Sequence, residues 1–145
     1  ATRQWLPKER RTKMPAVITM EKPIVVAVDE SREMLDILKS VIAGAGYRFF
    51  GAGNAQQCMR LVRDVEPNLI LLYIQMPETD GFELCRQIRA IEAFKDIPVA
   101  FVTARRTAQD VKSGIAAGGN DFITKPFDAK NLRARIDRWV KQKQA

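Results

Sequence analysis

At 145 residues, the chain has room for one ordinary domain but not for two. An apolar content of 46% with mixed charges is typical of a soluble globular protein and excludes fibrous and intrinsically disordered classes. The longest apolar run, residues 69–74, is far too short to cross a bilayer, and the charged N-terminus lacks the apolar segment of a signal peptide. We therefore expect a cytoplasmic protein.

The formal net charge of +7 is concentrated near the N-terminus. Residues 1–22 contain six basic and two acidic side chains, a net charge of +4, which leaves +3 for the other 123 residues. The body of the chain is only mildly basic, so its charge does not by itself indicate a nucleic-acid-binding domain.

The N-terminal segment, residues 1–22, shows no sustained helical or strand periodicity. It holds a basic cluster at Lys8–Arg11, and we interpret it as a basic extension or linker. An alternative interpretation is an arm that docks on a partner, and only Trp5 and the run Pro15–Ile18 support it.

From Pro23 onward, strands and helices alternate. Ile24–Val28 is a β-branched apolar run typical of a strand buried on both faces, and residues 31–43 carry an apolar stripe at helical spacing that ends at Gly44 and Gly46. The alternation then repeats, with strands expected near 47–52, 69–74, 98–103 and 120–124 and helices near 55–65, 81–93, 107–117 and 128–142.

Five strand–helix repeats with short connections predict an α/β fold: a doubly wound, five-stranded parallel sheet in a single domain. We expect this domain to span residues 23–142 and to be followed by a short tail at 143–145. In such sheets, ligands bind beyond the carboxyl ends of the strands. The residues that close each strand are therefore the candidates for function.

The two cysteines, Cys58 and Cys85, fall on apolar faces of predicted helices. We interpret both as small buried core residues. A disulfide or metal role is disfavoured, because no metal-ligand spacing surrounds them and the chain has no histidine.

Polar groups stand at the ends of four predicted strands. Two acids, Asp29 and Glu30, follow the first strand; Tyr73 closes the third, Thr103 the fourth, and Lys125 follows the fifth. Because parallel strands end at one edge of a sheet, we expect these side chains to converge in one shallow pocket. Two adjacent acids after an apolar strand need a cation, and either Mg²⁺ or the amine of Lys125 suits them.

Four segments match, in order and with the expected spacing, the receiver domains of bacterial response regulators. These segments are Val28–Glu30, Leu71–Leu84, Pro98–Ala104 and Asp121–Phe127. The resemblance covers about residues 23–142 and is strong because all four segments agree. It implies a flavodoxin-like (βα)5 fold, similar to chemotaxis regulators, and a role in two-component or phosphorelay signal transduction.

The resemblance also implies roles for the pocket residues. In that family, an acid pair and the aspartate that closes the third strand bind Mg²⁺, and this aspartate accepts a phosphoryl group from a phosphohistidine or a small phosphodonor. By position, Asp29 and Glu30 correspond to the acid pair, and Thr103 and Lys125 to the residues that contact the phosphoryl oxygens. Tyr73 occupies the acceptor position.

Three further positions follow from the resemblance. Phe122 corresponds to the aromatic switch residue, and Gln75 to the position whose backbone carbonyl usually binds the metal. The Lys125–Pro126 bond corresponds to one that is often cis in relatives.

Tyr73 at the acceptor position argues against phosphorylation. A carboxylate is ionised at neutral pH, whereas a phenol is protonated and needs a base before it can attack phosphorus. The replacement also removes one of three metal-binding carboxylates and puts a larger ring in the pocket. We therefore expect no catalytic residue, no required cofactor, and only a weakened Mg²⁺ site at Asp29, Glu30 and the Gln75 carbonyl.

Tyr73 has two interpretations. In one, the pocket is a relic and the ring merely plugs it. In the other, the plug holds the domain in one of the two family conformations. Separately, the hydroxyl is expected to donate to Asp29 or Glu30, or to accept from Lys125.

The last predicted helix is basic and amphipathic. Its apolar stripe is Leu132, Ile136 and Trp139, with Trp139 expected to be partly exposed, and its basic residues are Arg133, Arg135, Arg138, Lys141 and Lys143. In relatives, the face built from the fourth helix, the fifth strand and the fifth helix docks partners or forms dimers. We therefore expect an acidic protein partner there, or a homodimer. Arg105 and Arg106 either belong to that surface or are merely solvated.

The sequence thus predicts a non-enzymatic, atypical receiver module, a pseudo-receiver that acts by phosphorylation-independent protein–protein interaction. One alternative is an active phosphoacceptor that uses Asp29, Glu30 or Tyr73. Another is a nucleic-acid binder that uses the basic arm and the last helix, although no motif that reads bases is present. We expect no membrane partner and no specific nucleic-acid partner.

Overall fold

The computed structural model describes residues 22–144 except for 77 and 105, and the side chains only as far as Lys141. Predictions that concern residues 1–21, Arg105 or the side chain of Lys143 therefore lie outside the described residues. None of the described helices is long and apolar enough to cross a membrane.

A single parallel sheet of five strands forms the centre of the domain. The strands are β1 (Ile24–Val28), β2 (Arg48–Ala52), β3 (Leu69–Tyr73), β4 (Val99–Thr103) and β5 (Asp121–Thr124). Their order in the sheet is β2-β1-β3-β4-β5, and every pairing is parallel. The predicted doubly wound α/β fold is confirmed.

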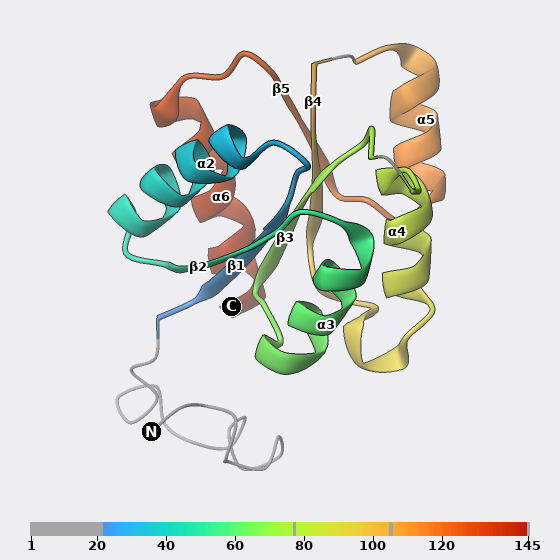
Figure 1. Ribbon diagram of the computed structural model, residues 1–145, viewed down its shortest axis with the longest axis horizontal. Coiled ribbons are helices and arrows are strands. Elements are labelled where there is room, and N and C mark those ends of the chain that lie inside the picture. The colour runs from blue at the N-terminus through green and yellow to red at the C-terminus, as the bar shows by residue number, and fades with distance from the viewer. Residues whose placement is uncertain (1–21, 77, 105, 145) are drawn as a thin grey trace.

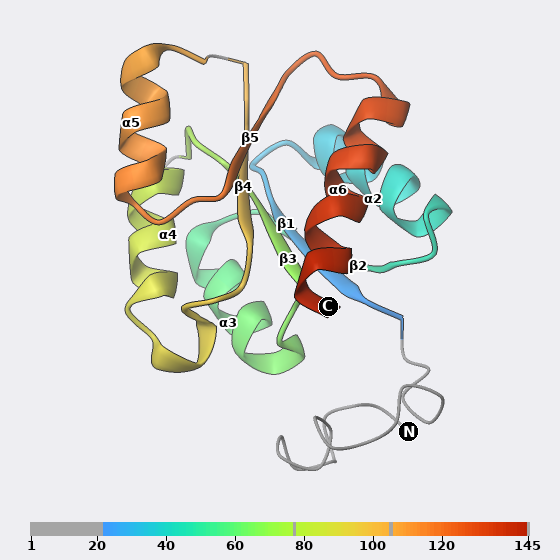
Figure 2. The ribbon, with the colours of Figure 1, turned by 180° about the vertical axis from the view of Figure 1, so that it is seen from behind.

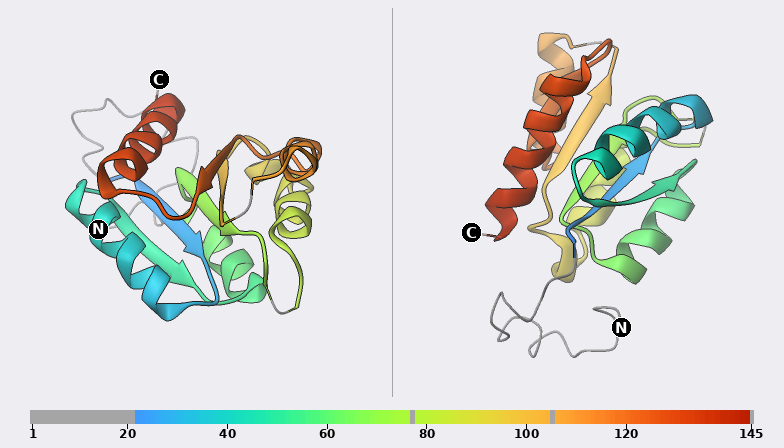
Figure 3. Two further views of the ribbon diagram at one scale, coloured as in Figure 1. Left: turned by 90° about the horizontal axis from the view of Figure 1, so that it is seen from above. Right: turned by 90° about the vertical axis from the view of Figure 1, so that its left-hand side faces the viewer.

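Helices cover both faces of this sheet. The α-helices are α2 (Arg32–Gly44), α3 (Ala55–Val65), α4 (Gly81–Arg89), α5 (Ala108–Ala116) and α6 (Ala129–Gln144). Figure 1 shows α2 and α6 on one side of the sheet and α3, α4 and α5 on the other, and the view from above in Figure 3 shows the same layers. Seen from behind in Figure 2, α5 lies above α4.

The apolar side chains of the strands divide between two cores. Strand residues alternate between the two faces, so Val25 and Ala27 pack with α2 and α6, whereas Val26 and Val28 pack with α3 and α4. All five residues of β1 are buried, as the β-branched run predicts for a central strand.

Both cysteines lie in the core on the α3 and α4 side, as predicted. Cys58 and Cys85 are fully buried and unpaired. Burial raises the pKa of the Cys58 thiol to about 12 and also raises the pKa of Cys85, although Arg89 and Arg86 act against it there. Both thiols therefore stay protonated at neutral pH.

Short polar side chains fix the start of α2, α3, α4 and α5, which each follow a strand. Ser31, Asn54, Asp80 and Thr107 each accept a hydrogen bond from a backbone N–H of the first turn. At α5 the interaction is reciprocal, because Asp110 also accepts from the backbone N–H of Thr107. These caps place the helices close behind the carboxyl ends of the strands, where the candidate site lies.

The third helix is shorter than the sequence predicts. A helix is expected near 81–93, but α4 ends at Arg89 and a separate 3-10 turn follows at Glu92–Phe94. Arg89 explains the break, because its guanidinium donates to the carbonyl oxygens of Phe94 and Gly118 and to the side chain of Asn120. These bonds turn the chain back so that Phe94 is buried before β4 begins.

Tyr47 connects β2 to α6. Its hydroxyl donates to Asp137 Oδ1 at 2.5 Å, and burial together with this carboxylate raises the pKa of Tyr47 to about 12. Replacing Tyr47 with phenylalanine should lower the free energy of unfolding by about 1 kcal/mol near neutral pH, measured by urea denaturation.

The pH dependence tests the same contact. A raised pKa means that the contribution of Tyr47 is complete below its ordinary pKa near 10 and is lost as the pH rises through about 12. The stability difference between wild type and Tyr47→Phe should therefore shrink between pH 10 and 12. A difference that stays constant over this range would mean that the phenol is not the group responsible.

Candidate functional site

The register of the sheet brings the polar strand ends to one edge. Val28 lies beside Leu72, and Tyr73 beside Val102, so the residues that follow β1 and β3 are neighbours. This edge is the upper end of the sheet in Figure 1. Asp29, Tyr73, Thr103 and Lys125 meet there, as the parallel sheet predicts.

A buried ion pair occupies the centre of the site. Lys125 Nζ lies 3.1 Å from Asp29 Oδ2, and the two side chains are only 18% and 3% exposed. The other oxygen, Asp29 Oδ1, accepts from the backbone N–H of Ser31 at 2.9 Å. Each carboxylate oxygen of Asp29 therefore already has a donor, as a buried charge requires.

The same ammonium group lies over the ring of Tyr73. Lys125 Nζ is 4.1 Å from the ring centroid, within the range of a cation–π contact. A hydrogen bond through the hydroxyl is expected from the sequence, whereas the contact with Lys125 is made through the ring face. The aromatic ring thus supplies part of the negative potential that a carboxylate would supply at this position.

Strand β5 is closely tied to β4 at this edge. The backbone N–H of Lys125 donates to the carbonyl oxygen of Thr103 at 2.7 Å, and Thr103 is buried. The Lys125–Pro126 peptide bond is cis, as the resemblance implies.

Two of the expected site residues are exposed. Glu30 is exposed, and together with Asp29, Arg32 and Lys39 it lines a groove at this edge. The cap at Ser31 turns the chain into α2 directly after Asp29 and carries Glu30 outward. Gln75 is also exposed, and its backbone forms an isolated antiparallel bridge with Asp80.

A Mg²⁺ ion at this edge would compete with contacts that Asp29 already makes. Such an ion needs several oxygen ligands, whereas the oxygens of Asp29 accept from Lys125 and from the Ser31 N–H, and Tyr73 supplies no carboxylate. Within residues 22–144, apart from 77 and 105, no three His, Cys, Asp or Glu side chains form a group that could hold a metal ion.

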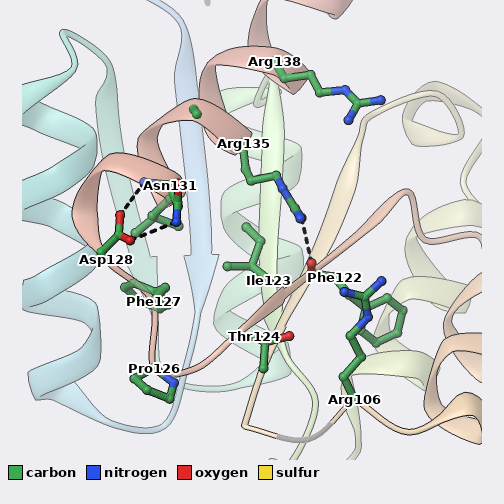
Figure 4. A pocket seen from close by; sticks show the side chains of 12 residues that line it. Arg106, Phe122, Ile123, Thr124, Pro126, Phe127, Asp128, Asn131, Arg135 and Arg138 are labelled. Carbon is green, nitrogen blue, oxygen red and sulfur yellow. Dashed lines mark hydrogen bonds between the residues drawn. The ribbon is translucent and has the colours of Figure 1, made fainter.

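A second feature is a cavity of about 590 Å³ between β5 and α6. Figure 4 shows Arg135 and Arg138 of α6 on one side of it and Arg106, from the β4–α5 loop, on the other. Phe122 and Leu132 also line it, and both are buried.

Not every arginine of this cavity is free to bind a partner. Arg135 Nη1 donates to Asp121 Oδ1 at 2.9 Å and to the carbonyl oxygen of Phe122 at 2.8 Å, as the dashed line in Figure 4 indicates for the latter. The indole of Trp139 donates to Asp121 Oδ2 at 2.9 Å. Arg135 and Trp139 therefore fasten α6 to β5, and Trp139 is half-buried, as predicted.

Sequence reasoning missed this network because its members are distant in the chain. Asp121 opens β5, whereas Arg135 and Trp139 stand one helical turn apart on α6. Their i and i+4 spacing is the only signal in the sequence that the two side chains share a face.

The fold and the strand-end site define the class of this protein, an α/β signalling domain of the receiver type. The profile of the response regulator receiver domain matches residues 25–137, so the chain belongs to this family. Transcriptional regulatory protein YvrH of Bacillus subtilis is 36% identical over 124 residues, which are 85% of this chain and 51% of the relative. DNA-binding response regulator MtrA of Mycobacterium tuberculosis is 34% identical over 118 residues, 81% of this chain and 50% of MtrA.

Solved structures agree with this assignment. The non-phosphorylated HemR receiver domain of Leptospira biflexa is 30% identical, with a TM-score of 0.75 over 82% of this chain and 94% of that structure. Chemotaxis protein CheY4 of Vibrio cholerae, at 23% identity, shares the fold with a TM-score of 0.78, over 81% of this chain and 98% of CheY4. The chain spans about half the length of the curated relatives it matches.

Proposed function

We propose that this receiver domain acts in two-component signal transduction by binding a protein partner, without accepting a phosphoryl group. The observation that carries the proposal is the position of Lys125, whose ammonium is bound to Asp29 and lies against the ring of Tyr73. This arrangement is complete without a phosphoryl group or a metal ion.

The chemistry of Tyr73 supports the proposal. A phenol must lose its proton before it can attack phosphorus, and no histidine exists in the chain to take that proton. The ring of Tyr73 contacts the ammonium of Lys125, a cation that accepts no proton. By the same proposal the domain requires no Mg²⁺ and is not an enzyme.

Incubation with acetyl phosphate and Mg²⁺ tests the proposal. We expect no gain in the intact mass of the wild-type chain. A phosphoryl group that is labile to hydroxylamine would mean that Asp29 or Glu30 has become the acceptor. A stable adduct would assign it to Tyr73, and either result would contradict the proposal.

The cavity between β5 and α6 is the proposed partner site. Arg106 and Arg138 carry positive charge at this cavity, and Pro126 and Phe127 are among its apolar lining residues. Asp128 also lies on the rim, but its carboxylate accepts from the backbone N–H and the side chain of Asn131 at the start of α6. This composition suits an acidic protein segment with an apolar anchor.

Charge reversal at Arg106 and Arg138 tests the partner site. The double variant Arg106→Glu, Arg138→Glu should bind a synthetic peptide of glutamate and leucine at least about tenfold more weakly than wild type, measured by calorimetry. The matched control reverses Arg60 and Arg63, two exposed residues of α3 on the other side of the sheet. If both double variants bind the peptide equally weakly, the loss of affinity comes from the change in net charge and not from the cavity.

A further inference from the structure

The outer side of β2 is a free lateral edge of the sheet. β2 stands first in the order β2-β1-β3-β4-β5, and among the described residues it pairs with β1 alone. Its first residue, Arg48, turns its main chain toward β1, because the N–H of Arg48 donates to the carbonyl oxygen of Pro23 at 2.8 Å. Main-chain polar groups alternate between the two sides of a strand, so those of Phe49 and Gly51 face outward. Two N–H donors and two carbonyl acceptors therefore line this lateral edge.

A groove of about 570 Å³ runs beside the lateral edge. Phe49, Phe50 and Gly51 line it from β2, and Leu35 and Lys39 line it from α2. Gly51 is exposed and has no side chain to screen its main chain. A strand added to β2 would place every second side chain on the side of α2, in this groove.

The charge of the groove favours neither an acidic nor a basic occupant. Apart from Asp29, whose carboxylate is paired with Lys125, its charged lining residues are two acids and two bases. These are Glu30, Asp36, Arg32 and Lys39. An uncharged extended segment, bound through main-chain hydrogen bonds, suits such a groove.

The chain that precedes β1 arrives next to this lateral edge. Ile24, which opens β1, lies beside Arg48, which opens β2. A segment that pairs with the outer side of β2 is two strand spacings from β1, about 10 Å, and residues 20–23 reach about 13 Å when extended. Because such a segment must then turn into β1, which is parallel to β2, it would run antiparallel to β2.

The residues before that connection have the composition of a strand. Residues 16–20 are Ala-Val-Ile-Thr-Met, with three consecutive β-branched side chains and no charge. Pro15 precedes them, and proline is tolerated where a strand begins. This segment is therefore the uncharged occupant that the groove suits, and it is already tethered beside the lateral edge, which raises its effective concentration there.

We propose that residues 16–20 add to the sheet as a sixth strand, antiparallel to β2, and close its free lateral edge. In this arrangement Thr19 lies opposite Phe49 and Val17 opposite Gly51, and each pair exchanges two main-chain hydrogen bonds. The four outward polar groups of β2 are then all bound.

The side chains of the proposed strand fit both faces of the sheet. Ile18 lies beside Phe50 on the side of α3, and a β-branched residue next to an aromatic one stabilises paired strands. A closed lateral edge also cannot pair with a strand of another chain. The inference does not depend on the proposed function.

Amide hydrogen exchange of the full chain, followed by NMR, tests the sixth strand. The double variant Val17→Pro, Thr19→Pro removes both donors of the proposed strand and leaves the described domain unchanged. We expect the amides of Phe49 and Gly51 to exchange at least about tenfold faster in this variant than in wild type.

The neighbouring amides of β2 and a second variant provide the controls. The N–H groups of Arg48 and Phe50 face β1, so their exchange should be the same in both proteins. Thr2→Pro, Gln4→Pro introduces two prolines at the same spacing outside the proposed strand, and it should exchange as wild type does.

Four results would overturn the proposal. Fast exchange of Phe49 and Gly51 in wild type would mean that the lateral edge is open, and slow exchange in both wild type and the Val17, Thr19 variant would mean that another part of the domain covers it. Protection that falls on dilution of the wild-type chain would assign the lateral edge to a second copy. Equal acceleration in the Thr2, Gln4 variant would mean that the effect is not specific to residues 16–20.

Discussion

Replacing Lys125 with methionine should lower the free energy of unfolding by about 3 kcal/mol, measured by urea denaturation. The replacement leaves the carboxylate of Asp29, 3% exposed, with the Ser31 N–H as its remaining donor. Removing one member of a buried pair costs about 3–5 kcal/mol, and we expect the lower end because Lys125 is 18% exposed.

An exposed ion pair provides the control. Lys95 lies 2.9 Å from Glu92, but the side chains are 53% and 87% exposed, so Lys95→Met should change the stability by less than about 1 kcal/mol. The double variant Asp29→Asn, Lys125→Met should be more stable than Lys125→Met alone, because it removes the isolated charge of Asp29. If Lys125→Met and Lys95→Met lose the same stability, the ion pair of Asp29 and Lys125 is no better shielded from water than an exposed pair.

The second large effect is expected at Gly119. A Cβ there would lie 2.2 Å from Cε2 of Phe101, a ring with no exposed surface, so alanine forces the ring or the β4–β5 region to move. Forcing extra volume into a filled core costs about 1–3 kcal/mol, and we expect Gly119→Ala to fall near 2 kcal/mol in thermal or urea unfolding.

Gly44 at the end of α2 is the comparison for Gly119. No atom lies within 4 Å of a Cβ built at Gly44, and alanine favours the helical backbone there. Gly44→Ala should therefore be neutral or stabilising by up to about 1 kcal/mol. A Gly119→Ala variant as stable as wild type would mean that the ring of Phe101 moves aside at little cost.

The ion pair bears on signalling as well as on stability. If the contacts of Lys125 hold the domain in one conformation, Tyr73→Asp should return a carboxylate to the acceptor position and free the ammonium from the ring. Binding of the peptide with and without acetyl phosphate then reports on that conformation. If Tyr73→Asp binds the peptide as wild type does, both with and without acetyl phosphate, Tyr73 does not lock the domain. The proposed partner site is unaffected by that result.

Much of the fold and part of the site followed from local patterns. The β-branched run at Ile24–Val28 and the repeated helical stripes required a parallel sheet, because strands that alternate with helices can only pair that way with short connections. The same patterns predicted the convergence of four strand-end residues, because parallel strands end at one edge of a sheet. These residues are Asp29, Tyr73, Thr103 and Lys125. These inferences needed only spacing and side-chain type.

Contacts between side chains distant in the chain were decided by tertiary structure. The sequence does not distinguish Asp29 from Glu30. In the structure Asp29 is buried and accepts from the N–H of Ser31, whereas Glu30 is exposed. Lys125 has a long flexible side chain, and whether it meets a hydroxyl or a ring face depends on how β3 and β5 are spaced across β4.

Tertiary structure also decided the cavity between β5 and α6 and the contact of Phe101 with Phe122. Asp121 accepts from Arg135 and Trp139 only because α6 packs back along β5, and Phe101 meets Phe122 only in the observed register. A shift of one residue in that register would turn these rings to opposite faces of the sheet. The sequence by itself therefore determined which residues gather at the strand ends, and the packing of the strands and helices decided which of them touch.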